Sequence, residues 1–132
     1  MKRLIPLLLL LTLCAFTQRT ITSPRVVDGD TIVIDVKAAP ELPPLHLRIL
    51  GIDTPERHGK CQSEKDKANE AKIYLTNLLK DKVVTYEIVG WDKYGGRVDG
   101  NVYVNGQSVA DLMISAGYAY SYNGGKRKNW CA

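Results

Sequence analysis

Residues 26–36 read Val-Val-Asp-Gly-Asp-Thr-Ile-Val-Ile-Asp-Val, and this stretch decides how the fold begins. Two runs rich in β-branched side chains flank Asp28-Gly29, and that dipeptide between such runs is a strong hairpin signal. We therefore expect two antiparallel strands joined by a tight turn at Asp28-Gly29. Prolines within residues 38–44 predict a loop or a strand edge after the hairpin, because proline cannot donate to a ladder.

Three further strands are predicted downstream. Residues 45–52 alternate at their start between apolar and polar side chains and predict a third strand. It ends at residues 53–56, Asp-Thr-Pro-Glu, since proline cannot continue the ladder. Residues 83–89 and 98–104 predict a fourth and a fifth strand, and the turn Asn105-Gly106 closes the fifth.

Two helices are predicted among these strands. Residues 63–80 begin with capping-box spacing at Ser63 and Asp66 and carry apolar side chains on one face. Residues 108–116 also have helical spacing and stop at Gly117, a glycine C-cap. Five short strands with a helix between the third and the fourth are the layout of an OB-fold. The expected fold class is mainly β with α (α+β), a five-stranded OB-fold barrel with two helices.

The N-terminal residues have the pattern of a secretory signal peptide. Basic Met1-Lys2-Arg3 precedes an apolar run from Leu4 to Phe16, shorter than the roughly 20 residues that cross a bilayer as a helix. The alternatives are an anchor helix or a buried core helix, but nothing extends the run. We expect a signal peptide over residues 1–19, cut between residues 15 and 20. The mature protein would be exported, periplasmic or extracellular, without stable membrane association.

The cysteines favour a structural disulfide. Removal of the leader takes Cys14 away and leaves Cys61 and Cys131, an even pair for an oxidising compartment. A bridge between them would close a loop of about 70 residues and add roughly 4 kcal/mol in the chain-entropy model. The alternative is two free thiols. Neither cysteine has the neighbours of a catalytic thiol.

Size and charge narrow the function classes. The 132 residues have room for one small domain, and they contain no repeat of solenoid period. The net charge of +4 falls to +2 when Lys2 and Arg3 leave, which permits a phosphate-bearing partner without demonstrating one. His46 and His58 are isolated and share no ligand spacing, which disfavours a histidine metal site.

Two acidic motifs carry the chemistry. Residues 28–31, Asp-Gly-Asp-Thr, and residues 53–56 are each ordinary turns when taken alone. Together they place carboxylates at the ends of neighbouring β elements, where they repel unless a cation or proton lies between them. Arg48 precedes the second motif, and Arg97 follows a third motif at residues 92–96, Asp-Lys-Tyr-Gly-Gly. The conjunction is a more specific signal than either motif alone.

The chain resembles the thermonuclease family, the staphylococcal-nuclease-like domains, over about residues 24–122. The resemblance rests on residues 27–31, 48–56 and 92–97, three motifs in family order. It implies a secreted nuclease that cuts DNA and RNA with Ca²⁺ and leaves 3′-phosphate and 5′-hydroxyl ends. Residues 123–132 replace the third helix of the staphylococcal protein with a basic tail, which we expect the disulfide to anchor.

The resemblance also implies a set of metal ligands. Asp30 and Asp53 would bind the metal through carboxylate oxygens, and Thr54 would bind it through its backbone carbonyl. Ca²⁺ takes oxygen ligands at about 2.3–2.6 Å and accepts irregular geometry completed by water and phosphate. These three residues are therefore the expected Ca²⁺ ligands.

The same resemblance assigns the catalytic and substrate-binding residues. Glu56 matches the general base that activates or positions the attacking water. Arg48 and Arg97 match two arginines that grip the phosphate, because a guanidinium can bind two phosphate oxygens at once. Lys93 and Tyr94 match positions that touch the substrate.

Several positions leave more than one interpretation open. A second glycine stands before Arg97, where the staphylococcal pattern has one. Arg48 and Asp53 have opposite strand parity, so strand twist or a bulge near Gly51 must bring them together. Three tyrosines near the C-terminus could stack on bases or pack the core, and the basic cluster of the tail could be solvated or could add phosphate affinity. They are Tyr118, Tyr120 and Tyr122, and Lys126, Arg127 and Lys128.

Two other function classes compete with the nuclease. One is a non-catalytic OB-fold module that binds nucleic acid, and the other is a small exported structural protein. Degenerate members of such families typically lose metal or base residues, whereas this chain retains them. A monomeric nuclease acting on DNA and RNA is therefore the leading hypothesis.

Overall fold

Short strands and two helices make up the computed structural model, which describes residues 17–35 and 43–131. In chain order the elements are β1 (Arg19–Thr22), β2 (Val26–Asp28), β3 (Thr31–Ile34), β4 (Leu45–Ile49), β5 (Ile52–Asp53), α1 (Gln62–Leu79), β6 (Val83–Trp91), β7 (Arg97–Val104), β8 (Gln107–Ser108), α2 (Val109–Ser115) and β9 (Tyr120–Ser121). The apolar run of the predicted signal peptide and most of the predicted proline loop lie outside the described residues. Within those ranges, none of the helices has the length and apolar character needed to cross a membrane.

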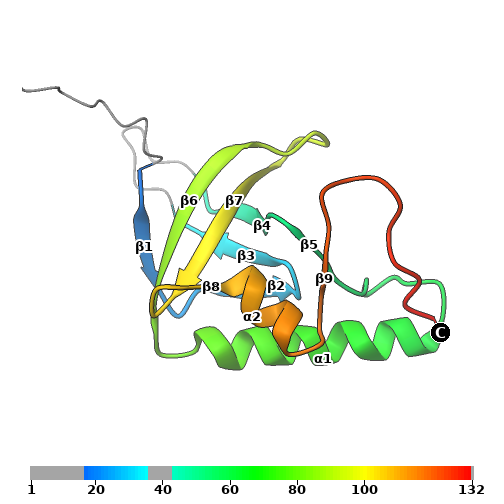
Figure 1. Ribbon diagram of the computed structural model, residues 1–132. Coiled ribbons are helices and arrows are strands. Elements are labelled where there is room, and N and C mark those ends of the chain that lie inside the picture. Colours follow the sequence, from blue (N-terminus) through cyan, green and yellow to red (C-terminus); the bar gives the residue numbers. More distant parts are fainter. Residues whose placement is uncertain (1–16, 36–42, 132) are drawn as a thin grey trace, which may run out of the picture.

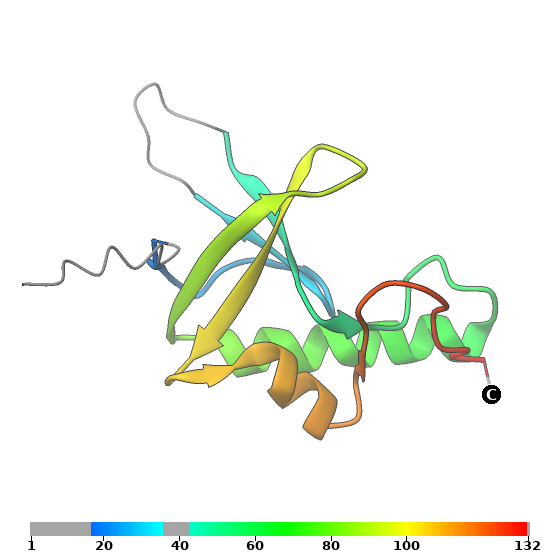
Figure 2. The ribbon, with the colours of Figure 1, turned by 45° about the horizontal axis from the view of Figure 1, so that its top comes forward.

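A strongly curled sheet covers one side of α1 (Figures 1 and 2). Its strand order is β1-β6-β7-β4-β3-β2, with β8 added to β7, and only the β4–β7 pairing is parallel. The short strands β5 and β9 pair with each other in a second sheet. The predicted fold class is confirmed: the protein is an α+β, OB-fold-like domain with two helices.

The core lies between the curled sheet and α1. Helix α1 buries Ala68, Ala71, Leu75 and Leu79, the face that the helical period predicts. Removing one such leucine side chain from water contributes about 1.5–3 kcal/mol. The sheet side of the core includes Ile32, Ile34, Leu47, Ile49, Val84, Tyr86 and Val102. This packing fixes the ends of β3, β4 and β7, which carry the polar residues of interest.

The first hairpin turn lies one position later than predicted. Strand β2 includes Asp28, a bulge falls between Val26 and Asp28, and the turn is Gly29-Asp30. The Asp30 N–H donates to Asp28 Oδ1 at 3.2 Å, so an aspartate side chain closes the turn. A Cβ on Gly29 would lie 2.9 Å from the Cβ of Ala71 in α1. Glycine therefore lets the acidic turn pack directly against the helix.

The third strand is shorter than predicted, so Arg48 and Asp53 lie on separate strands and the parity of one strand does not decide their faces. Strand β4 ends at Ile49, a turn follows at Leu50-Gly51, and the chain resumes as β5. Gly51 has a φ of +87°, a left-handed conformation that interrupts a regular strand. The turn lets Arg48 Nη2 donate to the Ile52 carbonyl at 3.3 Å.

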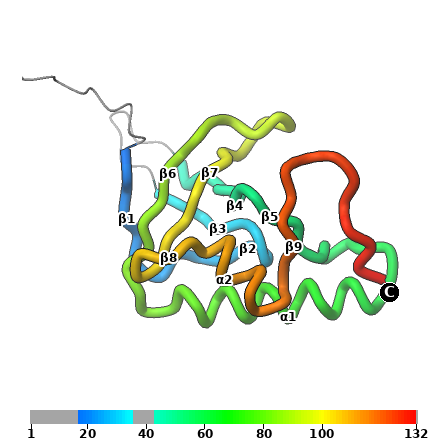
Figure 3. The backbone as a smooth tube through the Cα atoms, viewed as in Figure 1, coloured from blue at the N-terminus to red at the C-terminus, as the bar shows by residue number. Residues whose placement is uncertain are grey.

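Helix α1 begins at Gln62, and the predicted capping box at Ser63 is wrong. Its N-cap is Cys61, whose Sγ accepts the Glu64 N–H at 3.4 Å. Cys61 is also joined to Cys131, with 6.0 Å between their Cα atoms. The disulfide places the end of the chain beside the start of α1, as the backbone trace shows (Figure 3).

Helix α2 and strands β6 and β7 agree with the sequence to within two residues, whereas the short strands β1, β8 and β9 were not predicted. Helix α2 has Ser108 as its N-cap, and Gly117 follows it with a φ of +84°. The β7–β8 turn uses Asn105-Gly106, both at positive φ, as the dipeptide predicts. Strand β1, which pairs with β6, was not predicted, because Arg19–Thr22 offers no apolar alternation.

Candidate active site

A cleft of about 590 Å³ lies among the β6–β7 hairpin, the segment after β5 and the C-terminal tail, residues 123–131. Most of the residues predicted for the site line it. They are Asp30, Arg48, Glu56, Lys93, Tyr94 and Arg97. The other two, Asp53 and Thr54, are buried and contact Arg127, which itself lines the cleft.

Asp30 lies in the turn between β2 and β3 and Arg48 in β4, and their side chains approach each other in the cleft wall. Arg48 Nε lies 4.0 Å from Asp30 Oδ2, and the Thr31 hydroxyl donates to Asp30 Oδ1 at 2.8 Å. Burial, followed by the hydrogen bond and charge of Asp28, raises the pKa of Asp30 to about 6 against the opposing effects of Thr31 and Arg48. Asp30 is thus a carboxylate whose negative charge is incompletely compensated.

Asp53, Thr54 and Glu56 meet a single cation, the guanidinium of Arg127. Asp53 Oδ1 accepts from Arg127 Nε at 2.9 Å and from Nη2 at 2.5 Å, and Asp53 Oδ2 accepts the Lys128 N–H at 3.1 Å. The Thr54 carbonyl accepts from Arg127 Nη2 at 2.9 Å, and Glu56 Oε1 accepts from Nη1. Burial lowers the pKa of Arg127, but hydrogen bonds and charges from Asp53 and Glu56 outweigh it and raise that pKa.

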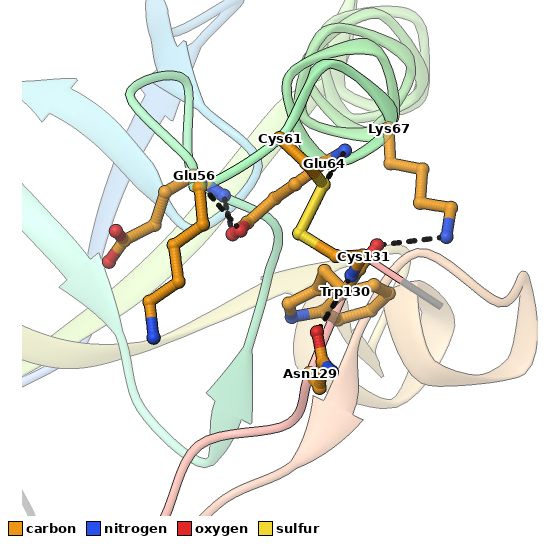
Figure 4. The surroundings of a disulfide bond; sticks show 8 residues. Glu56, Cys61, Glu64, Lys67, Asn129, Trp130 and Cys131 are labelled. Carbon is orange, nitrogen blue, oxygen red and sulfur yellow. Dashed lines mark hydrogen bonds between the residues drawn. A yellow bond between two sulfur atoms is a disulfide. The ribbon is translucent and has the colours of Figure 1, made fainter.

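Glu64 holds the backbone on which Glu56 sits. Its buried side chain accepts the Glu56 N–H through Oε2 at 3.1 Å and the Lys60 N–H through Oε1 at 3.2 Å (Figure 4). A Cβ on Gly59 would lie 2.5 Å from the Glu64 carboxyl carbon, so a glycine leaves room for this carboxylate. The Glu56 side chain itself is 58% exposed and lies at the mouth of the cleft.

Arg97 lines the cleft despite the inserted glycine. Gly95 and Gly96 both have a φ of +75°, so the insertion is absorbed in the turn of the β6–β7 hairpin. Arg97 Nε lies 3.2 Å from Asp92 Oδ2, and Asp92 Oδ1 accepts the Tyr94 N–H at 3.0 Å. The hydrogen bond from the Tyr94 N–H lowers the pKa of Asp92. The charge of Arg97 adds to this effect, and burial opposes it. Asp92 therefore orients both the turn and the arginine.

Asp99 is a further acid in this wall. It lies opposite Arg48 in the register of the β4–β7 ladder. Burial, and then the hydrogen bond and charge of Asp92, raise the pKa of Asp99. Among the described residues, its Oδ1 is one of two buried side-chain polar atoms without a hydrogen-bond partner. Two arginines and three acids thus alternate along one wall of the cleft. The arginines are Arg48 and Arg97, and the acids are Asp30, Asp92 and Asp99.

Exposed aromatic rings stand at the rim of the cleft. Trp91 is 71% exposed and Tyr94 is 80% exposed, and both line the cleft from the β6–β7 hairpin. Lys93 Nζ lies 5.0 Å from the centroid of the Tyr94 ring. Exposed rings beside cationic side chains are the usual platform for unstacked bases.

The C-terminal tyrosines divide between packing and the cleft. Tyr118 stacks on Tyr74 with 4.7 Å between ring centroids, and Tyr120 packs on Trp130 at the same separation. Tyr122 lines the cleft, and its hydroxyl donates to the Gly125 carbonyl at 3.0 Å. Packing therefore accounts for the first two rings, and only Tyr122 faces the site.

The oxygen-rich donor set fits a hard cation such as Ca²⁺. Arg127 shows the fit directly, because a positive charge already contacts the Asp53 carboxylate and the Thr54 carbonyl. Within residues 17–35 and 43–131, no three His, Cys, Asp or Glu side chains gather as a metal cluster. In the site that the resemblance implies, Asp30, Asp53 and the Thr54 carbonyl would hold the cation, and the rest of its shell would be water and phosphate, as Ca²⁺ tolerates.

Four residues that contact or support the site were not predicted to do so. Trp91, Asp99 and Glu64 carry no motif, and their roles depend on how the chain folds around them. Arg127 had one signal: it lies four positions before Cys131, so the predicted disulfide would return it to the start of α1. From the sequence, this basic cluster could be solvated or add phosphate affinity, and neither interpretation places Arg127 against Asp53.

Comparison with known proteins gives consistent matches. The family model described as "Staphylococcal nuclease homologue" matches residues 46–130. An "Uncharacterized endonuclease" of Escherichia coli is 33% identical over 128 residues, which is 92% of this chain and 74% of that protein. An uncharacterized protein of Bacillus anthracis is 32% identical over 97 residues, 71% of this chain and 43% of its own. An "Uncharacterized 38.1 kDa protein" of Capnoides sempervirens is 37% identical over 76 residues, which is 58% of this chain and 20% of that protein.

Proposed function

Because this chain belongs to the staphylococcal nuclease homologues, we propose that it is an exported, Ca²⁺-dependent nuclease that hydrolyses phosphodiester bonds of DNA and RNA. The name of the Escherichia coli relative supports nuclease activity. By resemblance to the family, the products carry 3′-phosphate and 5′-hydroxyl ends. The Cys61–Cys131 bridge supports export, since such bonds persist in oxidising compartments.

The convergence of Asp53, Thr54 and Glu56 on one cation carries this proposal. These residues lie beside a cleft that Arg48 and Arg97 also line. An anionic substrate could therefore lie between a cation-binding corner and two guanidinium groups. A scaffold protein gives no reason for these groups to face the same volume.

The chain's own residues divide the chemistry among them. Arg48 and Arg97 bind the phosphate and stabilise the negative charge that develops as the P–O bond breaks. Glu56, exposed at the mouth of the cleft, takes a proton from the attacking water. Trp91 and Tyr94 stack on bases next to the scissile bond. Bound Ca²⁺ supplies positive charge that neutralises phosphate oxygens.

Digestion of DNA and RNA by the mature protein tests the proposal. Cleavage should require added Ca²⁺ and stop when a chelator is added. Arg48→Ala should reduce the initial rate by about 100-fold or more, the usual effect of losing a donor to transition-state charge. Arg25→Ala removes the same side chain from an exposed position before β2, away from the cleft, and should retain the wild-type rate.

The same assay decides against the proposal if cleavage is absent. Binding of oligonucleotides without chelator-sensitive cleavage would identify the protein as a non-catalytic OB-fold module. Cleavage that Arg48→Ala leaves unchanged would mean that the cleft is not the place of reaction.

A further inference from the structure

The C-terminal tail occupies the Asp53 and Thr54 oxygens of the proposed cation site. Both carboxylate oxygens of Asp53 are engaged, Oδ1 by Arg127 and Oδ2 by the Lys128 N–H at 3.1 Å. The same guanidinium also donates hydrogen bonds to the Thr54 carbonyl, at 2.9 Å, and to the Glu56 carboxylate. A divalent cation and this guanidinium cannot contact the same oxygens together, so one must leave when the other binds.

The tail is held in this place by contacts on both sides of Arg127. On the C-terminal side, Cys131 is bonded to Cys61, and the buried Trp130 packs on Tyr120 and accepts at its carbonyl from Lys67 Nζ at 3.0 Å (Figure 4). Directly after Arg127, Lys128 Nζ lies 4.3 Å from the centroid of the Tyr120 ring. On the N-terminal side, Tyr122 pairs back to the Gly51 carbonyl through its N–H at 2.9 Å. The tail is therefore a closed loop that holds Arg127 over the site.

We propose that Arg127 is a tethered internal cation that competes with the divalent metal, so that displacement of the tail sets the metal affinity of this site. The proposal rests on the function proposed above and concerns the regulation of the same site. The disulfide strengthens the competition, because it keeps the guanidinium at high effective concentration near Asp53. Its reduction frees the end of the tail and favours the metal.

The size of the effect follows from the fraction of molecules in which the tail is open. An apparent dissociation constant equals the intrinsic constant divided by the open fraction. If the tail is closed in about nine molecules of ten, metal binds about 10-fold more weakly than it would to the open site. Charge-assisted bonds to two carboxylates and a carbonyl make such a closed fraction reasonable.

Calorimetric titration of Ca²⁺ into the full mature chain tests the competition without measuring activity. Arg127→Ala should bind Ca²⁺ about 10-fold more tightly than the wild type. Lys126→Ala is the matched control, since it removes an equal charge from the adjacent position of the same tail, and it should bind nearly as the wild type does. Circular dichroism establishes that each variant is folded.

Reduction of the disulfide gives an independent test of the competition between Arg127 and Ca²⁺. Treatment with dithiothreitol should tighten Ca²⁺ binding to the wild type and leave Arg127→Ala unchanged, because the competing group is already absent. The increase in thermal midpoint on adding Ca²⁺ should be larger for the reduced wild type and for Arg127→Ala than for the oxidised wild type, since tighter binding to the native state stabilises it more.

The outcomes separate this inference from the proposed function. Equal or weaker Ca²⁺ binding by folded Arg127→Ala, or a dithiothreitol effect of equal size in both proteins, overturns the competition. If that occurs while the wild type digests DNA with Ca²⁺, the nuclease proposal stands alone. If neither protein binds Ca²⁺ and neither digests DNA, both proposals fail.

Discussion

Glu64 accepts the backbone N–H of Glu56 at 3.1 Å, so a buried carboxylate at the start of α1 fixes the segment that carries an exposed one. The two acids differ only in surroundings. Glu64 lies inside the loop of residues 56–60, where its carboxylate accepts two backbone N–H groups. Glu56 projects into the cleft. The geometry of the proposed base therefore depends on the start of the helix.

Replacing Glu64 by alanine should destabilise the fold. The Glu56 and Lys60 N–H groups would lose their acceptor, and leaving such donors unsatisfied costs about 1–3 kcal/mol of unfolding free energy. Urea denaturation of the variant measures the loss. Glu70→Ala, at an exposed position of the same helix, should stay within about 0.5 kcal/mol of the wild type. Equal stability of the two variants would mean that Glu64 does not support this segment.

Replacing Asp99 by asparagine should stabilise the protein at neutral pH. Burial raises the pKa of Asp99, so its ionised form is disfavoured in the native state relative to the unfolded chain. Stability is therefore lost as the pH rises from the ordinary value of 3.8 through the raised native pKa. Asparagine has no such dependence. The gain of Asp99→Asn, measured by denaturation, should be larger at pH 7.5 than at pH 4, and the reverse order contradicts the assignment.

Trp91 should contribute to binding of single strands. Stacking of one base on an aromatic ring is worth about 1–3 kcal/mol, so Trp91→Ala should weaken oligonucleotide binding by roughly 5- to 150-fold. Fluorescence anisotropy in the presence of chelator measures binding without cleavage. Trp91→Phe should recover much of the affinity, and Ile73→Ala, exposed on α1, should change nothing. Unaltered binding by Trp91→Ala would remove this ring from the substrate site.

Arg97 should require its guanidinium and not merely its charge. Arg97→Lys keeps a cation beside Asp92 but loses the two-pronged contact with phosphate, so the initial rate of DNA cleavage should fall by at least about 10-fold. Arg25→Lys, at an exposed position outside the cleft, is the matched control. A lysine variant with full activity would show that Arg97 acts only through the ion pair with Asp92.

The sequence could predict the elements whose signals are local. The face of α1 at Ala68, Ala71 and Leu75 follows from helical periodicity, and the β7–β8 turn follows from Asn105-Gly106. The break of β4 at Gly51 and the shift of the first turn to Gly29-Asp30 could not be predicted. Both depend on packing between distant segments, such as Gly29 against Ala71.

Only the part of the site that lies in sequence motifs could be predicted. Asp30, Arg48 and Arg97 lie in motifs and line the cleft together. Arg127 is more than 70 positions from Asp53, and no local pattern shows that they meet. Strand parity alone would have separated Arg48 from Asp53, and only the turn at Gly51 removes that conflict.

The initial rate of the Glu56→Gln variant on a DNA substrate with Ca²⁺ tests the central claim most directly. Glutamine keeps the shape of Glu56 and its place beside Arg127 but cannot accept the proton of the attacking water. General-base catalysis contributes about 10²–10⁴-fold, so the rate should fall by at least about 100-fold while Glu70→Gln retains the wild-type rate. A Glu56→Gln protein that digests DNA as fast as the wild type would contradict the assignment of this cleft as a nuclease active site.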